Sequence, residues 1–126
     1  MYKEIEEGVN LFNEQDFFAA HDFFENLWIN ADNSDRLFYQ GIVQISVGGY
    51  HLLNENYRGA HSQFSKGTTK LKNYVPAYKG VELKFLIQKI EKIISKLEFY
   101  FLDKNVEIKI AEFPKVEKIQ NLLKGD

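Results

Sequence analysis

Cysteine is absent from the 126 residues, and its absence excludes several classes of site at once. Without thiols the chain has no disulfide framework, no thiolate zinc site and no cysteine nucleophile. No run approaches the roughly 18 apolar residues of a membrane span. The opening segment, MYKEIEEGVN, is acidic and lacks the apolar region of a signal peptide. We therefore expect a soluble protein of the cytoplasm with no membrane partner.

Arginine is also scarce, since only two of the 16 basic residues, Arg36 and Arg58, are arginines. Residues 1–63 carry three basic and ten acidic side chains, whereas residues 64–126 carry thirteen lysines and eight acids. A basic half can mark a nucleic-acid surface. Here, however, the lysines alternate with glutamates, as in residues 88–92, which is typical of a solvated helix face. With so little arginine to bind phosphates and bases, we do not expect a nucleic-acid partner.

Apolar residues, in contrast, are plentiful enough for one core, because hydrophobic residues make up 44% of the chain and aromatic residues 15%. Asp16 is predicted to cap the second helix of the chain, and Ser34 or Asp35 the third. The third helix is apolar around most of its circumference, which predicts a central position in the bundle. The spacing of the apolar residues predicts helices over residues 2–13, 17–29, about 36–53, about 57–73 and about 82–102.

The C-terminal part of the chain follows a different pattern. Val106, Ile108 and Ile110 alternate with charged residues, which predicts an extended segment laid along the bundle. Pro114 is predicted to open a short terminal helix that carries Val116, Ile119 and Leu122. We therefore predict one all-α domain over residues 1–126, a compact bundle of five or six helices with an extended C-terminal tail.

Two phenylalanines of the last long helix raise the question of self-association. Phe85 and Phe99 fall among lysines on the helical wheel, where solvent is expected. The extended tail can cover them within the same chain, or it can reach a second copy and form a symmetric dimer. A monomer and a homodimer both stay open, and the folded-back tail is favoured because it needs no partner.

The helix over residues 17–29 carries the first candidate site. His21 and Glu25 lie one turn apart on it, with aromatic and aliphatic side chains on both sides. A carboxylate in such surroundings needs a partner, because burying an unpaired charge is costly. We therefore expect His21 and Glu25 to be largely buried and to meet directly or through one water. Trp28 lies beside them, either as a core anchor or as a ring that stacks on a ligand.

The third helix offers a matching polar stripe. Arg36, Gln40, Gln44 and His51 project within one sector of its wheel. Gly41 and Gly48 lie beside this stripe and allow another helix to approach closely. Polar groups on a central helix must find partners, so we expect Arg36 or Gln40 to reach the His21–Glu25 pair. The candidate binding site is therefore His21, Glu25, Trp28, Arg36, Gln40 and Gln44.

Together these residues resemble a known family. His21-x3-Glu25-x2-Trp28, followed by a polar loop and by Arg36-x3-Gln40, is similar to the bacterial and archaeal family catalogued as domain of unknown function 309. The resemblance covers about residues 5–75, although many members carry Glu after the His, where this chain has Asp22. It implies a compact helical bundle in which one helix is surrounded by the others. It implies no established activity, and metal binding only as a suggestion from the motif.

Three interpretations of the His21–Glu25 pair remain open. In the first, the pair is a buried hydrogen bond that fixes helix packing. In the second, it binds a divalent transition metal, which needs three or four ligands, so that His51 and His61 would have to help. In the third, Glu25 orients His21 as a proton carrier.

These interpretations give two candidate functions. The first is a small helical protein that binds a small ligand or another protein, or acts as a scaffold, with a partly buried polar site. The alternative is a metal-dependent or acid/base hydrolytic enzyme that uses His21 and Glu25.

Overall fold

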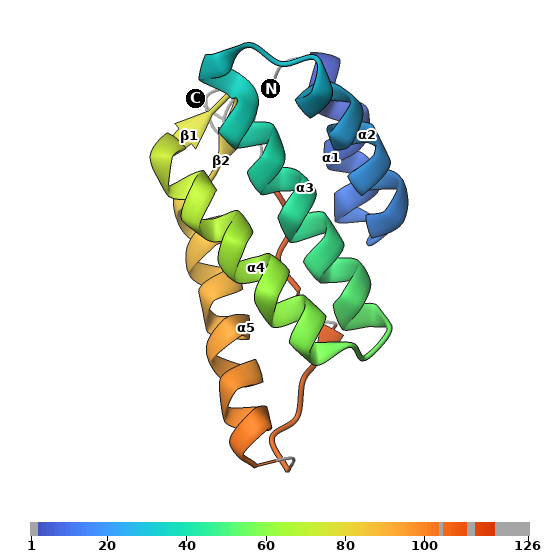
Figure 1. Cartoon of the computed structure of the whole chain (residues 1–126), viewed down its shortest axis with the longest axis vertical. Coiled ribbons are helices and arrows are strands. Elements are labelled where there is room, and N and C mark those ends of the chain that lie inside the picture. The colour runs from blue at the N-terminus through green and yellow to red at the C-terminus, as the bar shows by residue number, and fades with distance from the viewer. Residues whose placement is uncertain (1–2, 104, 111–112, 118–126) are drawn as a thin grey trace, which may run out of the picture.

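The computed structural model describes residues 3–103, 105–110 and 113–117, and these residues form an all-α bundle, as predicted (Figure 1). A short 3-10 turn, Lys72–Tyr74, and a two-stranded hairpin of β1 (Ala77–Tyr78) and β2 (Val81–Glu82) interrupt the helices. In this described part, no helix is both long and apolar enough to cross a membrane. The five helices described are α1 (Lys3–Asn13), α2 (Phe17–Ile29), α3 (Asn33–Leu53), α4 (Tyr57–Leu71) and α5 (Lys84–Leu102).

The predicted cap of α2 is confirmed, whereas the predicted caps of α3 are wrong. Asp16 caps α2, since its Oδ1 accepts from the backbone N–H of Ala19 at 3.4 Å. For α3, however, the N-cap is Asp32, and neither Ser34 nor Asp35 takes this role. The carboxylate of Asp35 is instead engaged by the hairpin that follows α4. The helix begins at Asn33, earlier than the start at about residue 36 that the sequence predicted.

Helix α3 lies between α2 and α4, as Figure 1 shows, and its glycines set the close approach. A Cβ at Gly41 would lie 2.8 Å from Cγ of Leu71, and one at Gly48 would lie 2.5 Å from Cδ1 of Phe64. Both neighbours belong to α4, so the expected role of these two glycines is confirmed.

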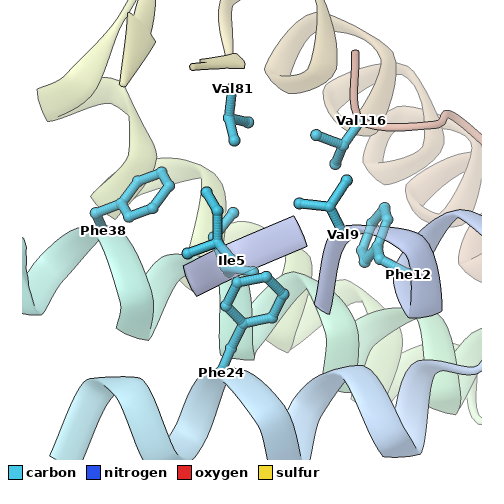
Figure 2. A pocket seen from close by; sticks show the side chains of 8 residues that line it. Ile5, Val9, Phe12, Phe24, Phe38, Val81 and Val116 are labelled. Carbon is cyan, nitrogen blue, oxygen red and sulfur yellow. The ribbon is translucent and has the colours of Figure 1, made fainter. Parts of the chain in front are cut away.

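The core is closed by the hairpin and the tail as well as by the helices. Figure 2 shows side chains that converge from α1, α2 and α3, from β2 and from the C-terminal tail. The space left between them is only about 10 Å³, room for about one water molecule at most. The side chains around this space are Ile5, Val9, Phe12, Phe24, Phe38, Ile42, Val81 and Val116.

The hairpin was not predicted from the sequence, which suggested a loop followed by a helix from about residue 82. Its turn residues Lys79 and Gly80 have φ angles of 50° and 76°, which a two-residue hairpin turn requires. Tyr78 pairs with Val81, and Ala77 pairs with Glu82. The carboxylate of Glu82 then accepts from the backbone N–H of Phe85 at 3.0 Å, so the helix begins at Lys84.

The tail runs back along the bundle in extended form, as predicted (Figure 1). Asn13 fixes it by exchanging two hydrogen bonds with the backbone of Val116, at 2.7 and 3.2 Å. The N–H of Glu82 also donates to the carbonyl of Glu117 at 3.0 Å. Because these bonds hold residues 114–117 extended, the prediction of a helix opening at Pro114 is wrong for them. Ile119 and Leu122, the other two apolar residues of the predicted terminal helix, lie outside the described residues.

The tail does not cover the two phenylalanines that were expected beneath it. Phe85 and Phe99 remain 57% and 62% exposed. Ile108 of the tail instead packs beside Leu52 and Ile93, on another side of α5. That part of the prediction is wrong, because the hydrogen bonds of Asn13 and Gln15 draw the tail toward the α1–α2 turn.

Candidate functional site

His21 and Glu25 are in direct contact on α2, as the sequence predicted. The Nε2 atom of His21 lies 2.8 Å from Oε2 of Glu25, and its Nδ1 atom lies 3.2 Å from Oδ1 of Asp22. Both ring nitrogens therefore face carboxylates, which only accept hydrogen bonds. The ring donates to both of them only when both nitrogens carry protons. In that form it has no lone pair to offer to a metal ion or a substrate proton.

The predicted burial of this pair is wrong. The side chain of His21 is 24% exposed and that of Glu25 is 42% exposed. The buried residues of α2 are Phe17, Ala20 and Phe24, which point into the core. His21 and Glu25 lie to one side of that face, and no other element covers the carboxylate completely. The pair is therefore a half-exposed contact between an imidazole and a carboxylate, an ion pair only when His21 is protonated, and not a buried hydrogen bond.

The polar stripe of α3 does not reach this pair. In the part of the chain that the structure describes, no hydrogen bond or ion pair joins Arg36 or Gln40 to His21 or Glu25. Arg36 is exposed, and Gln40 is half-buried. The expectation that one of them completes the pair is therefore wrong.

Neither of the remaining predicted site residues, Gln44 and Trp28, makes a hydrogen bond to the pair in the described part of the chain. Gln44 buries its Oε1 without a hydrogen-bond partner among the described residues. Trp28 packs against the core cluster, which favours the core-anchor interpretation over ligand stacking.

A pocket nevertheless forms beside His21, between α2 and α3. Its volume is about 220 Å³, and it is lined by Phe18, His21, Val47, Tyr50 and His51. The ring of Phe18 lies 5.8 Å from that of His21 and 5.7 Å from that of Tyr50, measured between centroids. His51, the last member of the polar stripe, is thus the one that the fold brings to His21. We call these five residues the α2–α3 pocket.

Of the five pocket residues, only His21 belongs to the predicted binding site. His51 was predicted only as a member of the polar stripe and a possible metal ligand, and Phe18, Val47 and Tyr50 were not predicted as site residues. Phe18 and Tyr50 remain 56% and 41% exposed. The signal that could have found them is the antiparallel pairing of two adjacent helices, which places the start of α2 opposite the end of α3. Close packing of Gly49 against the ring of Phe17 sets this alignment, with a Cβ there only 2.8 Å from the ring.

The second imidazole of the pocket is also oriented by a neighbour. Nδ1 of His51 lies 3.2 Å from Nδ2 of Asn56, the residue whose Oδ1 caps α4 by accepting from Gly59. An amide N–H donates there to an unprotonated Nδ1, so the Nε2 atom of His51 carries the proton in the neutral ring. His51 therefore presents a donor, whereas His21 is occupied by its carboxylates.

The metal interpretation finds no support in this arrangement. Among residues 3–103, 105–110 and 113–117, no three His, Asp or Glu side chains are grouped to hold a metal ion. His61, which would have to help, contacts Glu98 of α5 instead, with Nε2 and Oε2 2.9 Å apart. The residues present do not fit a metal centre built on His21 and Glu25.

A second polar cluster, which the sequence interpretation missed, joins α3 to the hairpin. The phenol of Tyr78 donates to Oδ1 of Asp35 at 2.5 Å, and Nζ of Lys79 lies 3.3 Å from Oδ2 of Asp35. Asp35 and Lys79 are only 20% and 18% exposed. The Lys79-Gly80 turn was the available signal, because it brings a lysine back over the start of α3.

This hairpin cluster perturbs the titration of its members. The hydrogen bond to Asp35 raises the pKa of the Tyr78 phenol, and burial and the charge of Asp35 raise it further. Burial raises the pKa of Tyr39, against the effect of the Lys79 ammonium. Burial alone would lower the pKa of Lys79, but Tyr39 and Asp35 outweigh it and raise the value. Each group therefore keeps its proton more firmly in the folded protein.

Comparison with known families confirms the resemblance that the sequence suggested. Residues 5–63 match the model of the family described as Domain of unknown function (DUF309). The match includes every residue of the α2–α3 pocket and ends within α4. The search among curated proteins returned no relative.

Proposed function

We propose that this protein is a binding module, starting from a family match that carries no assigned function. The observation that supports the proposal is the α2–α3 pocket, whose walls keep two aromatic rings exposed by 56% and 41%. Exposed aromatic side chains grouped around a hollow are typical of contact sites. Ligand sites are commonly apolar, with a few polar groups that fix orientation. Here His51 supplies a donor, and the carboxylates of Asp22 and Glu25 beside His21 supply acceptors.

The chemistry of the pocket favours a ligand with an aromatic or apolar group and a cationic end. Glu25 and Asp22 keep 42% and 61% of their side chains exposed beside the pocket. A carboxylate has several lone pairs, so each can accept from a ligand cation as well as from His21. The faces of Phe18 and Tyr50 also attract cations. The ligand is accordingly a small aromatic amine, or a basic or aromatic side chain of a partner protein.

Acid/base hydrolysis is the alternative, and the 2.8 Å contact of His21 with Glu25 is the observation in its favour. A general base needs an unprotonated nitrogen directed at the substrate. Both nitrogens of His21 face carboxylates instead. The contacts of His21 therefore favour binding over catalysis.

We propose the cytoplasm as the location and a monomer as the assembly. A cytoplasmic location fits the absence of cysteine, since secreted small domains depend on disulfides. A monomer fits a tail that makes its contacts with its own α1–α2 turn, through Asn13 and Gln15.

The binding proposal is tested by titrating benzylamine into ¹⁵N-labelled protein and following amide chemical shifts. We expect shifts confined to the α2–α3 pocket, with weaker binding of phenylacetate, which has the opposite charge. Phe18→Ala should weaken benzylamine binding about tenfold, an ordinary contribution for a central aromatic contact. Phe85→Ala is the matched control, because Phe85 is 57% exposed against 56% for Phe18 and lies on α5. Equal affinities for the two variants would contradict the proposal.

A further inference from the structure

A second hollow lies between α5 and the tail, and lysines dominate its mouth. It has a volume of about 130 Å³. Its apolar floor is formed by Leu52, Ile93 and Ile108. Its remaining lining residues are Lys89, Lys92, Lys96 and Lys109, so no acidic side chain lines it in the described part of the chain.

The gathering of lysines follows from the way α5 is oriented. Lys89, Lys92 and Lys96 recur at intervals of three and four residues, so they share one face of the helix. The two acids of the same stretch, Glu91 and Glu98, have other partners. Oε2 of Glu91 lies 2.9 Å from Nζ of Lys72, and Glu98 contacts His61.

The lysines and glutamates that alternate along the sequence thus lie on different sides of α5. The acids face the α4 side of α5, and the lysines face the tail, which returns Lys109 to the same mouth. The like charges of Lys89, Lys92 and Lys109 around one hollow repel each other, and low-dielectric walls strengthen their field. An anion placed among them removes this repulsion and gains charge-assisted hydrogen bonds.

The floor indicates what kind of anion fits. Leu52, Ile93 and Ile108 form a continuous apolar floor beneath the lysines. A neighbouring hollow of about 130 Å³ shares Leu52 and Ile108 with the first, but its lining is mixed and includes the carboxylate of Glu55. A purely inorganic anion would leave the apolar floor unused. A nucleic acid would need a longer basic track with aromatic stacking partners, and no aromatic side chain lines the lysine hollow.

We propose that this lysine hollow binds an amphipathic anion, with a carboxylate or phosphate head among the lysines and a short alkyl chain along Leu52 and Ile108. The site is separate from the α2–α3 pocket, with which it shares no lining residue. A test of anion binding in the lysine hollow is therefore independent of a test of amine binding in the α2–α3 pocket.

Isothermal titration calorimetry with octanoate and with octyl phosphate tests the proposal and distinguishes the two head groups. We expect at least one of them to bind, and to bind more weakly as salt is raised, because the contacts are ionic. Octanol and inorganic phosphate should bind at least about tenfold more weakly than the better ligand, which corresponds to 1.4 kcal/mol. Octanol that binds as tightly would show that the lysines contribute nothing.

Charge variants locate the site. Lys89→Gln/Lys92→Gln should weaken binding about tenfold or more, as expected for lost charge-assisted contacts. Lys66→Gln/Lys84→Gln is the matched control, because it removes the same charge from exposed lysines outside the hollow. Circular dichroism checks that both variants are folded. Equal loss in the two variants would overturn the proposal, since it would show a general charge effect.

A further variant and a competitor test the apolar floor. Ile108→Ala should weaken the binding of octanoate and leave the binding of inorganic phosphate unchanged, because only the alkyl chain contacts this residue. An unchanged octanoate affinity would contradict the placement of the chain. A single-stranded oligonucleotide that displaced octanoate at lower concentration would overturn the proposal in favour of nucleic-acid binding.

Discussion

Removing the carboxylate of Asp35 should destabilise the protein strongly, because this one side chain fastens the hairpin to α3. In Asp35→Ala, the phenol of Tyr78 loses an acceptor at 2.5 Å and Nζ of Lys79 loses a counter-charge at 3.3 Å. A hydrogen bond to a charged group contributes about 1.5–3 kcal/mol. The ion pair adds about 1 kcal/mol at most, because its partners are still a fifth exposed and solvent screens them.

The sum is a loss of about 1.5–4 kcal/mol in the free energy of unfolding. For a domain of this size, about 4 °C of melting temperature corresponds to each kcal/mol, so the midpoint should fall by about 6–16 °C. Urea unfolding followed by circular dichroism gives the free energy, and a thermal scan gives the midpoint.

A matched substitution separates this effect from the loss of a negative charge at the start of α3. Asp32 is exposed at the N-cap of the same helix, and its side chain makes no capping hydrogen bond. Asp32→Ala should therefore change the free energy of unfolding by about 0.5 kcal/mol or less. If Asp35→Ala were as mild as Asp32→Ala, the hairpin cluster would not hold the fold as argued here.

Three further predictions concern pH, the His21–Glu25 pair and the assembly. The raised pKa values of Tyr78 and Lys79 mean that their stabilisation is complete below the unfolded pKa, about 10, and is lost as pH rises through the folded values. Urea titrations from pH 9 to about 12 should show this fall, and Tyr78→Phe should flatten it; an equally steep fall in the variant would contradict the assignment. Glu25→Gln should cost less than about 1 kcal/mol, because the pair is half-exposed; a cost of several kcal/mol would show burial in solution. Light scattering at micromolar concentration should give a mass near 14.8 kDa, and a doubled mass would mean that the tail or α5 is shared.

The helices were predictable from the sequence because their apolar periodicity is long and regular, whereas the hairpin was not. Each strand of the hairpin has two residues, too few for any periodicity. Its position is decided by Asp35, whose carboxylate reaches forward to Tyr78 and Lys79. The sequence could not show that Asp35 has this partner, and it therefore suggested a helix cap in its place.

The candidate site was also predictable only in part. The His21–Glu25 contact follows from the geometry of a single helix, and the structure has it at 2.8 Å. The solvent exposure of the pair depends on which neighbouring element covers that side of α2. A helical wheel describes one helix alone and does not show its neighbours. The wheel also left open whether α2 or α4 would pack against Gly41 and Gly48. In the described part of the chain the two glycines pack against α4, Arg36 and Gln40 make no hydrogen bond or ion pair with the His21–Glu25 pair, and His51 lines a pocket together with His21.

If the α2–α3 pocket is a ligand site, a bound probe must lie in direct contact with its side chains. Isotope-filtered nuclear Overhauser spectra of ¹³C-labelled protein with benzylamine report which protein protons lie near the ring of the probe. We expect cross-peaks from that ring to Phe18, Val47 and Tyr50. Cross-peaks to other surface aromatics, such as Phe85 or Phe99, without any to these three would contradict the proposed site.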